Sequence, residues 1–498
     1  VTVYVNGEPK RTFHLDSSSA YQYVDGSNVY DTKATDHSHA RFSFDEVHGF
    51  FGVHVNPGDT VTIENNGVEL ALDFVELENV PAPIPQPENS ISITDSAYGA
   101  EDGQDSTVAF EKALKAAIEQ KKTLYIPVGE FKINKKIDFT ADGLTVTGAG
   151  MWYSKLNFTT NEKGGGGFEI GHNSNRLTFS NFAMTSALTS RYDHLKEKAQ
   201  YKAFAGSFGK DSRIDHMWIE HFECGAWIGD YDSKMRYTDH LVIENSRIRN
   251  NLADGVNFTQ GTRNSVVRNS NIRNNGDDSL ATFSSSIHTN VYAENNSFEH
   301  NTIELGWRAG GVGIFGGKNH KVTNNLIKDS RGGAGIRVST VFANEGFGLG
   351  FDDNNEILIK DNMIVNSGTT NDFYWPHSKP RSNIDFEETF GPIKGITVQN
   401  NVFVNPVYTD EAITHAGVEL DGKVKIIDSK VQGNTYSDPY KVDASMSHSV
   451  ENGKEVYNFT YGNQPTFLPE NSTAFERDYN YRGEREVDGH IIRLWEHK

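Results

Sequence analysis

The chain has 498 residues and a formal net charge of −20 at pH 7, from 67 acidic and 47 basic side chains. This charge disfavours nucleic acid, anionic lipid and polyanionic polysaccharide as partners, because the long-range field repels them. No run of 18 apolar residues is present to span a membrane, and the single cysteine, Cys224, excludes a disulfide framework and thiolate metal clusters. We expect a secreted monomer, its signal peptide absent from this chain, that binds a neutral ligand.

Residues 1–78 contain short runs in which apolar and polar residues alternate, separated by Gly, Asn, Asp and Pro. This pattern predicts a small antiparallel β-sandwich, similar to a carbohydrate-binding module. The next residues, 79–90, contain four prolines, which lack a backbone donor and favour an extended spacer. We therefore place a domain boundary at this linker.

Residues 91–498 begin with an amphipathic helix, VAFEKALKAAIEQ, for which Asp105 or Ser106 can provide the N-cap. From about residue 140, short apolar-alternating strands end in asparagine-rich turns at intervals of 24 residues and more. Such a period is typical of a solenoid, in which each coil adds one strand to each sheet. We predict an all-β chain, with a right-handed parallel β-helix of the pectin-lyase-like type over 91–498 and the helix covering its open end.

The asparagines of the repeats fit turn positions and not ligand positions, because Asn tolerates the left-handed conformation and can pair with its own kind in ladders. We assign this structural role to Asn181, Asn250, Asn274, Asn301, Asn324, Asn362 and Asn401.

Three aspartates stand out in these repeats. The segment NSRIRNN at 245–251 returns as NSNIRNN at 269–275, 24 residues later, with six of seven residues identical. Asp254 and Asp278 are also 24 residues apart, so they should face each other on adjacent coils, about 4.8 Å apart. Gly276 permits a turn that brings Asp277 to the same side. Three converging carboxylates suit glycosidic hydrolysis, whereas ordinary turn residues or a calcium site are the alternatives.

The segments ADGVN and NNGDDSLA, one coil apart on an Asn-rich β-helix, resemble the catalytic region of glycoside hydrolase family 87, the α-1,3-glucanases or mutanases. More distantly they resemble polygalacturonases and β-helical dextranases. The resemblance implies an inverting endo-hydrolase of α-1,3-glucan, such as mutan or fungal cell-wall α-glucan, and of its oligosaccharides. It implies that Asp254, Asp277 and Asp278 are the catalytic residues, with Asp277 as the acid and the other two holding the water.

Aromatic, acidic and basic residues near the expected groove are candidates for substrate binding, because flat rings stack on sugar faces and charged groups bind hydroxyls. Alignment of NNSFEHN with NSNIRNN places Glu304 roughly in phase with Asp277. The candidates are Trp227, Glu304, Trp307, Arg308, Arg337, Tyr374 and Trp375.

Several alternatives remain open from the sequence. They are a mycodextranase-like or dextranase-like hydrolase, a polygalacturonase, which the acidic charge disfavours, a polysaccharide lyase, which would need a basic cluster, and a non-enzymatic β-helical carbohydrate-binding protein. The proposed chemistry needs no cofactor. Structural calcium fits the acidic loop at 352–356 and the acidic turns of the N-terminal region.

Overall fold

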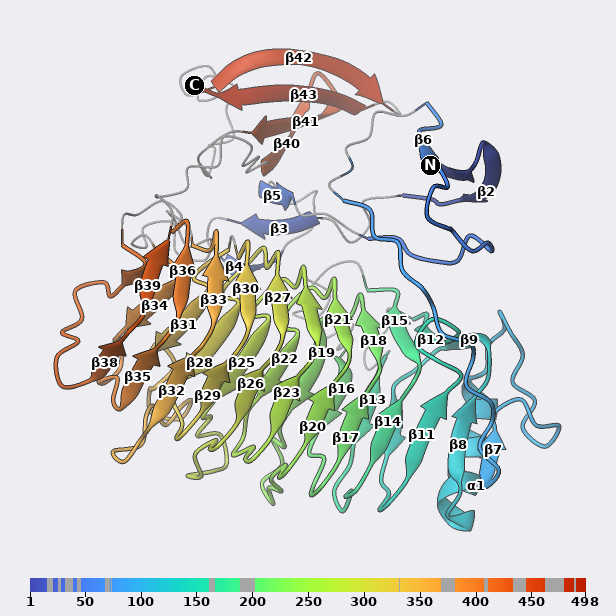
Figure 1. Cartoon of the computed structure of the whole chain (residues 1–498), viewed down its shortest axis with the longest axis horizontal. Helices are drawn as coiled ribbons and strands as arrows, with labels where there is room; N and C mark the ends of the chain where they lie inside the picture. Colours follow the sequence, from blue (N-terminus) through green and yellow to red (C-terminus); the bar gives the residue numbers. More distant parts are fainter. Residues whose placement is uncertain are drawn as a thin grey trace.

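The computed structural model describes residues 1–15, 21–25, 28–31, 39–42, 46–67, 72, 74–160, 166–188, 202–330, 332–368, 381–406, 411–432, 445–461, 479–487 and 490–498. Across these residues the chain is almost entirely β-strand, and three long parallel sheets run side by side (Figure 1). This arrangement confirms the predicted all-β class and the predicted parallel β-helix.

The ten-stranded sheet, called sheet I, contains β10 Ile137–Phe139, β13 Phe168–Ile170, β16 Lys202–Gly206, β19 Cys224–Ile228, β22 Val256–Phe258, β25 Leu280–Phe283, β28 Val312–Phe315, β31 Ile336–Ser339, β34 Ile384–Glu387 and β37 Ile413–Thr414. The twelve-stranded sheet, sheet II, contains β7 Ser90–Ser92, β8 Thr123–Ile126, β11 Thr145–Gly148, β14 Thr178–Ser180, β17 Arg213–Asp215, β20 Val242–Glu244, β23 Val266–Arg268, β26 Ser297–Glu299, β29 Lys321–Thr323, β32 Ile357–Lys360, β35 Ile396–Gln399 and β38 Val424–Ile427.

The eleven-stranded sheet, sheet III, contains β9 Gly129–Ile133, β12 Ser154–Phe158, β15 Ala183–Ser186, β18 Trp218–Glu220, β21 Arg247–Arg249, β24 Asn271–Arg273, β27 Thr302–Glu304, β30 Leu326–Lys328, β33 Met363–Val365, β36 Val402–Val404 and β39 Lys430–Gln432. From β8 onward the chain visits sheet II, sheet III and sheet I in turn, so each complete coil adds one strand to each sheet.

The core of the β-helix consists of stacked apolar side chains that point inward from equivalent positions of successive coils. In sheet III, Ile248, Ile272, Ile303, Ile327 and Ile364 follow one another in register, and each is 0% exposed. A fully buried side chain of this size contributes roughly 1.5–3 kcal/mol relative to an exposed one. Repetition of such stacks along the coils holds the three sheets together.

Asparagines form the turns between sheets, as predicted. Asn181, Asn250, Asn274 and Asn324 have φ between 53° and 61°, a left-handed conformation that Asn adopts at low cost. Asn301, Asn325, Asn362 and Asn401 form a buried ladder, in which each side-chain N–H donates to the next side-chain oxygen at 2.9–3.1 Å. The ladder satisfies amide groups that burial would otherwise leave without a partner.

The predicted helix is α1, Thr107–Gln120, which packs its buried face, including Phe110, Ala113, Leu114 and Ala117, at the end of the β-helix beside β7 and β8 (Figure 1). The Asp105 carboxylate accepts the Thr107 backbone N–H at 3.0 Å, whereas Ser106 makes no side-chain capping bond. Helix α1 therefore covers the first coil and shields its core from water, as expected for a repeat fold. No helix in the described ranges is long and apolar enough to cross a bilayer.

Two smaller sheets flank the β-helix. One joins β2 Glu8–Thr12, β1 Thr2–Val5 and β6 Val61–Glu64 in an antiparallel arrangement. The other joins β4 Asn28–Asp31, β3 Tyr21–Asp25, β5 His39–Phe42, β40 Ser445–Glu451, β41 Lys454–Tyr461, β43 His490–His497 and β42 Tyr479–Val487.

The second of these sheets changes the predicted boundaries. The parallel coils end at β39. Strand β40 pairs with the N-terminal strand β5, and β41, β43 and β42 continue that sheet, so the prediction of a β-helix as far as residue 498 is wrong beyond β39. These last strands are seven to nine residues long, whereas the strands of the coils have two to five residues.

The N-terminal region is tied to the β-helix and is not held away by a spacer. Within the proline-rich segment, the Ile84 N–H donates to the Ala149 carbonyl at 2.8 Å, and the Tyr153 hydroxyl donates to the Pro81 carbonyl at 2.7 Å. Arginines on β21 and β24 also form ion pairs with glutamates of residues 46–78. The linker and the residues around it therefore lie against sheet III.

Candidate active site

Asp254, Asp277 and Asp278 lie in the turns that lead from sheet III into sheet I. Strands β22 and β25 pair in parallel with Val256 opposite Leu280, which places Asp254 opposite Asp278 on adjacent coils, as the 24-residue spacing predicts. One carboxylate oxygen of each of the three aspartates lies within 4.8 Å of the others. Asp254 is 6% exposed and Asp278 is 5% exposed, whereas Asp277 is half-buried.

Backbone hydrogen bonds fix the orientation of the doublet. Asp277 Oδ1 accepts the Asp278 backbone N–H at 3.0 Å, and Asp278 Oδ1 accepts the Gly310 backbone N–H, one coil further on, at 2.8 Å. These bonds hold the two carboxylates in place before any ligand binds. The arrangement can transfer protons and bind a water molecule, and it can also hold a hard cation, because three carboxylates offer the oxygen ligands that such an ion prefers.

Gly276 and Trp307 shape the turn that carries the doublet. A Cβ atom on Gly276 would lie 2.3 Å from Trp307 Cζ2 and 2.5 Å from the Leu252 carbonyl oxygen, so only glycine permits this approach. The Trp307 ring is 8% exposed, and its indole N–H donates to the Asn274 carbonyl at 3.2 Å. The structure therefore places Trp307 against the turn, as a support for the aspartates.

Glu304 does not lie where the sequence alignment placed it. Strand β27 pairs with β24 so that Glu304 stands opposite Arg273, and the prediction that Glu304 is in phase with Asp277 is wrong. Its carboxylate accepts hydrogen bonds from Arg273 at 2.7 Å and Asn271 at 2.9 Å and pairs with Lys328 at 2.8 Å. Arg308 is 0% exposed and lies in the turn between β27 and β28, one coil beyond the doublet.

Trp227 and Arg337 lie in the same outward-facing row of sheet I. The register runs Trp227, Asn257, Ala281, Gly313 and Arg337, each opposite the next. Glycine at position 313 lets two other side chains approach the sheet: a Cβ atom on Gly313 would lie 2.8 Å from Asp278 Oδ2 and 2.6 Å from Phe315 Cε2. The second carboxylate oxygen of Asp278 and the Phe315 ring therefore lie side by side over Gly313.

Trp227 and Arg337, at the two ends of this row, have large side chains that also form hydrogen bonds. The half-buried Trp227 donates its indole N–H to the Tyr231 hydroxyl at 3.0 Å. Arg337, which is 8% exposed, donates Nε–H to Glu387 at 3.1 Å and lies over the Phe315 ring at 5.7 Å from its centroid. Tyr374 and Trp375 lie outside the described residues.

Two groups near the aspartates were missed or dismissed by sequence reasoning. Tyr231, four residues beyond Trp227, is 39% exposed, and the repeat spacing gave no signal for it because it lies in a loop. Cys224 is buried, and burial, followed by the nearby charge of Asp254, raises the pKa of its thiol well above the usual value. Such a thiol stays protonated, which agrees with its predicted role in the core.

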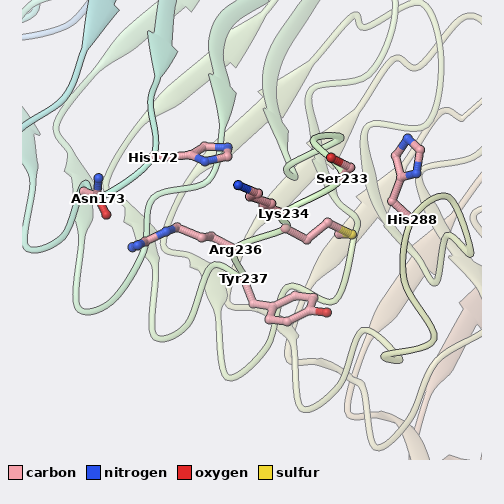
Figure 2. Close-up of a pocket in the computed structure, with 8 residues that line it drawn as sticks. His172, Asn173, Ser233, Lys234, Arg236, Tyr237 and His288 are labelled. Carbon is pink, nitrogen blue, oxygen red and sulfur yellow. The ribbon is translucent and has the colours of Figure 1, made fainter.

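A surface cavity of about 550 Å³ lies at the opposite ends of the sheet I strands. Its lining comes from loops that follow β13, β19 and β25, whereas the aspartates precede β22 and β25. Figure 2 shows His172, Lys234, Arg236 and His288 around this basin. His172 Nε2 lies 3.0 Å from Asp230 Oδ2. The cavity is therefore separate from the carboxylate site.

Two family descriptions match the chain. Residues 104–425 match "Alpha-1,3-glucanase catalytic domain D2", and residues 1–80 match "Alpha-1,3-glucanase catalytic domain D1". No curated protein matches the chain significantly.

Among solved structures, the Agl-KA catalytic domain is 37% identical, with a TM-score of 0.74 and coverage of 86% of this chain and 84% of that one. The catalytic unit of a thermostable GH87 α-1,3-glucanase from Streptomyces thermodiastaticus strain HF3-3 is 26% identical, with a TM-score of 0.66 and coverage of 88% and 85%. A GH87 α-1,3-glucanase catalytic domain in complex with tetrasaccharides shares the fold, with 21% identity, a TM-score of 0.63 and coverage of 88% and 84%.

Proposed function

Because the chain belongs to the α-1,3-glucanase family of glycoside hydrolases, family 87, we propose that it hydrolyses α-1,3-glucan within the chain, with Asp254, Asp277 and Asp278 as catalytic residues. The observation that carries this proposal is the convergence of the three carboxylates within 4.8 Å on adjacent coils of the matched segment. Carboxylates that served only as turn residues would not be expected to converge, because like charges at this distance repel one another.

In the proposed mechanism Asp277 is the general acid. It donates its proton to the glycosidic oxygen as the bond from that oxygen to the anomeric carbon breaks, so the leaving sugar departs as an alcohol. Asp254 and Asp278 hold the attacking water, and one of them takes its proton as the water oxygen bonds to the anomeric carbon. The Gly310 N–H supports this role of Asp278, because a hydrogen bond to a carboxylate favours the charged form that a base requires.

Attack by water from the face opposite the leaving group inverts the α-linkage and gives a β-anomeric product. The 4.8 Å limit refers to nearest oxygens, one from each aspartate, and is shorter than the roughly 6.5–9.5 Å between the carboxyl groups of most inverting pairs. We therefore propose that the water lies directly between the carboxylates and that inversion follows from its position. The stereochemistry of the first product tests this part of the proposal.

The substrate is proposed to be a neutral glucan and its oligosaccharides. The net charge of −20 disfavours the polyanion that a polygalacturonase or a uronate lyase would bind. One GH87 relative has been crystallised with nigerose, and one with tetrasaccharides. The chain is proposed to act outside the cell, because its insoluble polysaccharide substrate would be found there. It is proposed to act as a monomer. No cofactor takes part in the proposed chemistry, and any calcium would be structural.

Incubation with insoluble α-1,3-glucan, dextran and polygalacturonate, followed by product analysis, tests the proposal. We expect α-1,3-linked oligosaccharides from the first polymer alone, with the β-anomer seen first by NMR. Release of isomaltose-series products would assign the chain to the dextranases. Binding of glucan without any reducing-sugar release would make it a carbohydrate-binding protein, and an α-anomeric first product would exclude inversion.

A further inference from the structure

Four phenylalanines pack together at the ends of β25 and β28: Phe283, Phe315, Phe342 and Phe347. Phe283 and Phe315 end β25 and β28, whereas Phe342 and Phe347 come from the loop after β31. The ring centroids of Phe315 and Phe342 lie 5.0 Å apart, those of Phe283 and Phe347 lie 5.4 Å apart, and those of Phe342 and Phe347 lie 5.7 Å apart. These are the distances of mutual aromatic packing. We call these residues the phenylalanine cluster.

The cluster has a buried inner pair and an exposed outer pair. Phe283 is 7% exposed and Phe315 is 5% exposed, whereas Phe342 is 37% exposed and Phe347 is 41% exposed. Two neighbouring exposed aromatic rings are unusual in a chain that has abundant polar residues for its surface, and contiguous exposed apolar side chains mark contact sites.

Backbone hydrogen bonds prevent the outer pair from turning inward. The Leu349 N–H donates to the Ser284 carbonyl at 2.8 Å, and the Ser286 N–H donates to the Phe347 carbonyl at 2.9 Å. A Cβ atom on Gly348 would lie 2.3 Å from the Phe342 carbonyl oxygen, so the loop is packed tightly there. The loop is therefore fastened to the end of β25, and the exposed rings are held in their positions.

The cluster is continuous with the aspartates. Asp278 Oδ2 and Phe315 Cε2 both lie over Gly313, at 2.8 Å and 2.6 Å from the position that a Cβ atom would take there. Phe315 in turn packs on Phe342, and Arg337 lies over Phe315. A sugar chain that places one glucosidic bond at Asp278 would thus meet Phe315 next and the exposed rings of Phe342 and Phe347 beyond it.

We infer that the phenylalanine cluster is a stacking platform for the pyranose rings of the glucan chain beyond the bond that is cleaved. The inference rests on the proposed function. Its occupant is the glucan itself, because the platform joins the carboxylate site directly and because apolar ring faces suit the CH faces of a neutral sugar and not a charged ligand. The platform makes binding depend on chain length, since short oligosaccharides cannot span both the aspartates and the outer rings.

The test compares the wild-type protein with Phe342→Ala, Phe347→Ala and the double variant on α-1,3-linked oligosaccharides of increasing length. For long substrates we expect KM to rise about tenfold in the double variant with kcat within about twofold, because a binding contact shared by ground state and transition state is lost. For the shortest cleaved substrate we expect no change. Phe50→Ala, whose side chain is 39% exposed and stacks on Tyr153 away from sheet I, is the matched control and should behave as wild type.

Conservative variants separate stacking from simple packing. Phe342→Tyr keeps a flat ring and should retain the wild-type KM, whereas Phe342→Leu keeps apolar volume without a ring face and should resemble Phe342→Ala. Equal effects of Tyr and Leu, or KM values that do not depend on chain length, would overturn the platform. A change of oligomeric state in the double variant, measured by sedimentation with unchanged KM, would also overturn it and assign the rings to a contact between copies.

Depletion by insoluble α-1,3-glucan distinguishes failure of the platform from failure of the proposed function. Wild-type protein that binds the glucan without cleaving it, together with weaker binding by the double variant, would reject the hydrolase mechanism and retain the platform. Wild-type cleavage with equal binding by both proteins would retain the hydrolase mechanism and reject the platform.

Discussion

Replacing Arg273 by methionine should destabilise the protein more than the loss of any single exposed ion pair. Arg273 on β24 donates Nη1–H to Glu46 at 2.7 Å, Nη2–H to Glu76 at 2.7 Å and Nε–H to Glu304 at 2.7 Å. The side chains of Arg273, Glu46 and Glu304 are 5%, 10% and 6% exposed. Methionine keeps much of the volume but leaves two buried carboxylates without this cation, which costs about 3–5 kcal/mol.

The size of the effect can be converted to a melting temperature. An unfolding entropy of about 2.1 cal/mol/K per residue gives about 1 kcal/mol/K for a chain of 498 residues, so Tm should fall by about 3–5 °C in scanning calorimetry. Arg176→Met is the matched control, because its partner Asp142 and Arg176 itself are 47% and 61% exposed and such a pair is worth about 0.2–1 kcal/mol. Equal decreases of Tm in the two variants would refute the assignment of Arg273 as a buried cation that joins the N-terminal region to sheet III.

Three further predictions follow from the site and its supports. Gly276→Ala should lower the hydrolysis rate on α-1,3-glucan about tenfold or more, because the methyl group meets the Trp307 ring at 2.3 Å and displaces the aspartates; wild-type kinetics would contradict this. Burial alone would raise the pKa of Glu304, but hydrogen bonds from Lys328, Asn271 and Arg273 lower it to about 2. Its stabilisation is therefore present above the unfolded pKa of about 4.3 and lost as pH falls towards 2, so the Tm difference between wild type and Arg273→Met should shrink over that range. Treatment with EDTA should leave turnover unchanged, and lost turnover with an unchanged Tm would require a metal at the three aspartates.

Much of the fold could be predicted because each coil of a solenoid has the same local structure, so the same residue types recur at the same positions. Left-handed turns, buried ladders and in-register apolar stacks all appear in the sequence as recurring Asn and apolar positions at a fixed phase. Asp254 and Asp278 could be placed together for the same reason, since Val256 and Leu280 follow each of them by two residues and pair in the structure.

Glu304 was misplaced because a similar strand-and-turn unit occurs twice in each coil. The segment NNSFEHN belongs to the sheet II strand β26, whereas NSNIRNN belongs to the sheet III strand β24, so aligning them shifted the register by one strand. The exposures of Trp307 and Arg308 could not be predicted either, because side-chain direction in the turns depends on glycines such as Gly276 and Gly332 that allow close approach.

The phenylalanine cluster and the pairing of β5 with β40 depend on contacts between distant segments that have no repeat. Phe283 and Phe342 are 59 positions apart in the chain, and only the fastening of the loop to the end of β25 brings them together. Local sequence patterns carry no signal for such contacts.

The most direct test of the catalytic assignment is the initial rate of α-1,3-glucan hydrolysis by Asp254→Asn, Asp277→Asn and Asp278→Asn. Each substitution keeps the shape of the side chain and removes its ability to ionise, and Asp138→Asn, at a carboxylate 79% exposed on β10, is the control. We predict a loss of about a hundredfold or more in each of the three variants, with the Tm retained and the control at the wild-type rate. Near-wild-type rates in the three variants would contradict the assignment of the catalytic centre to these aspartates.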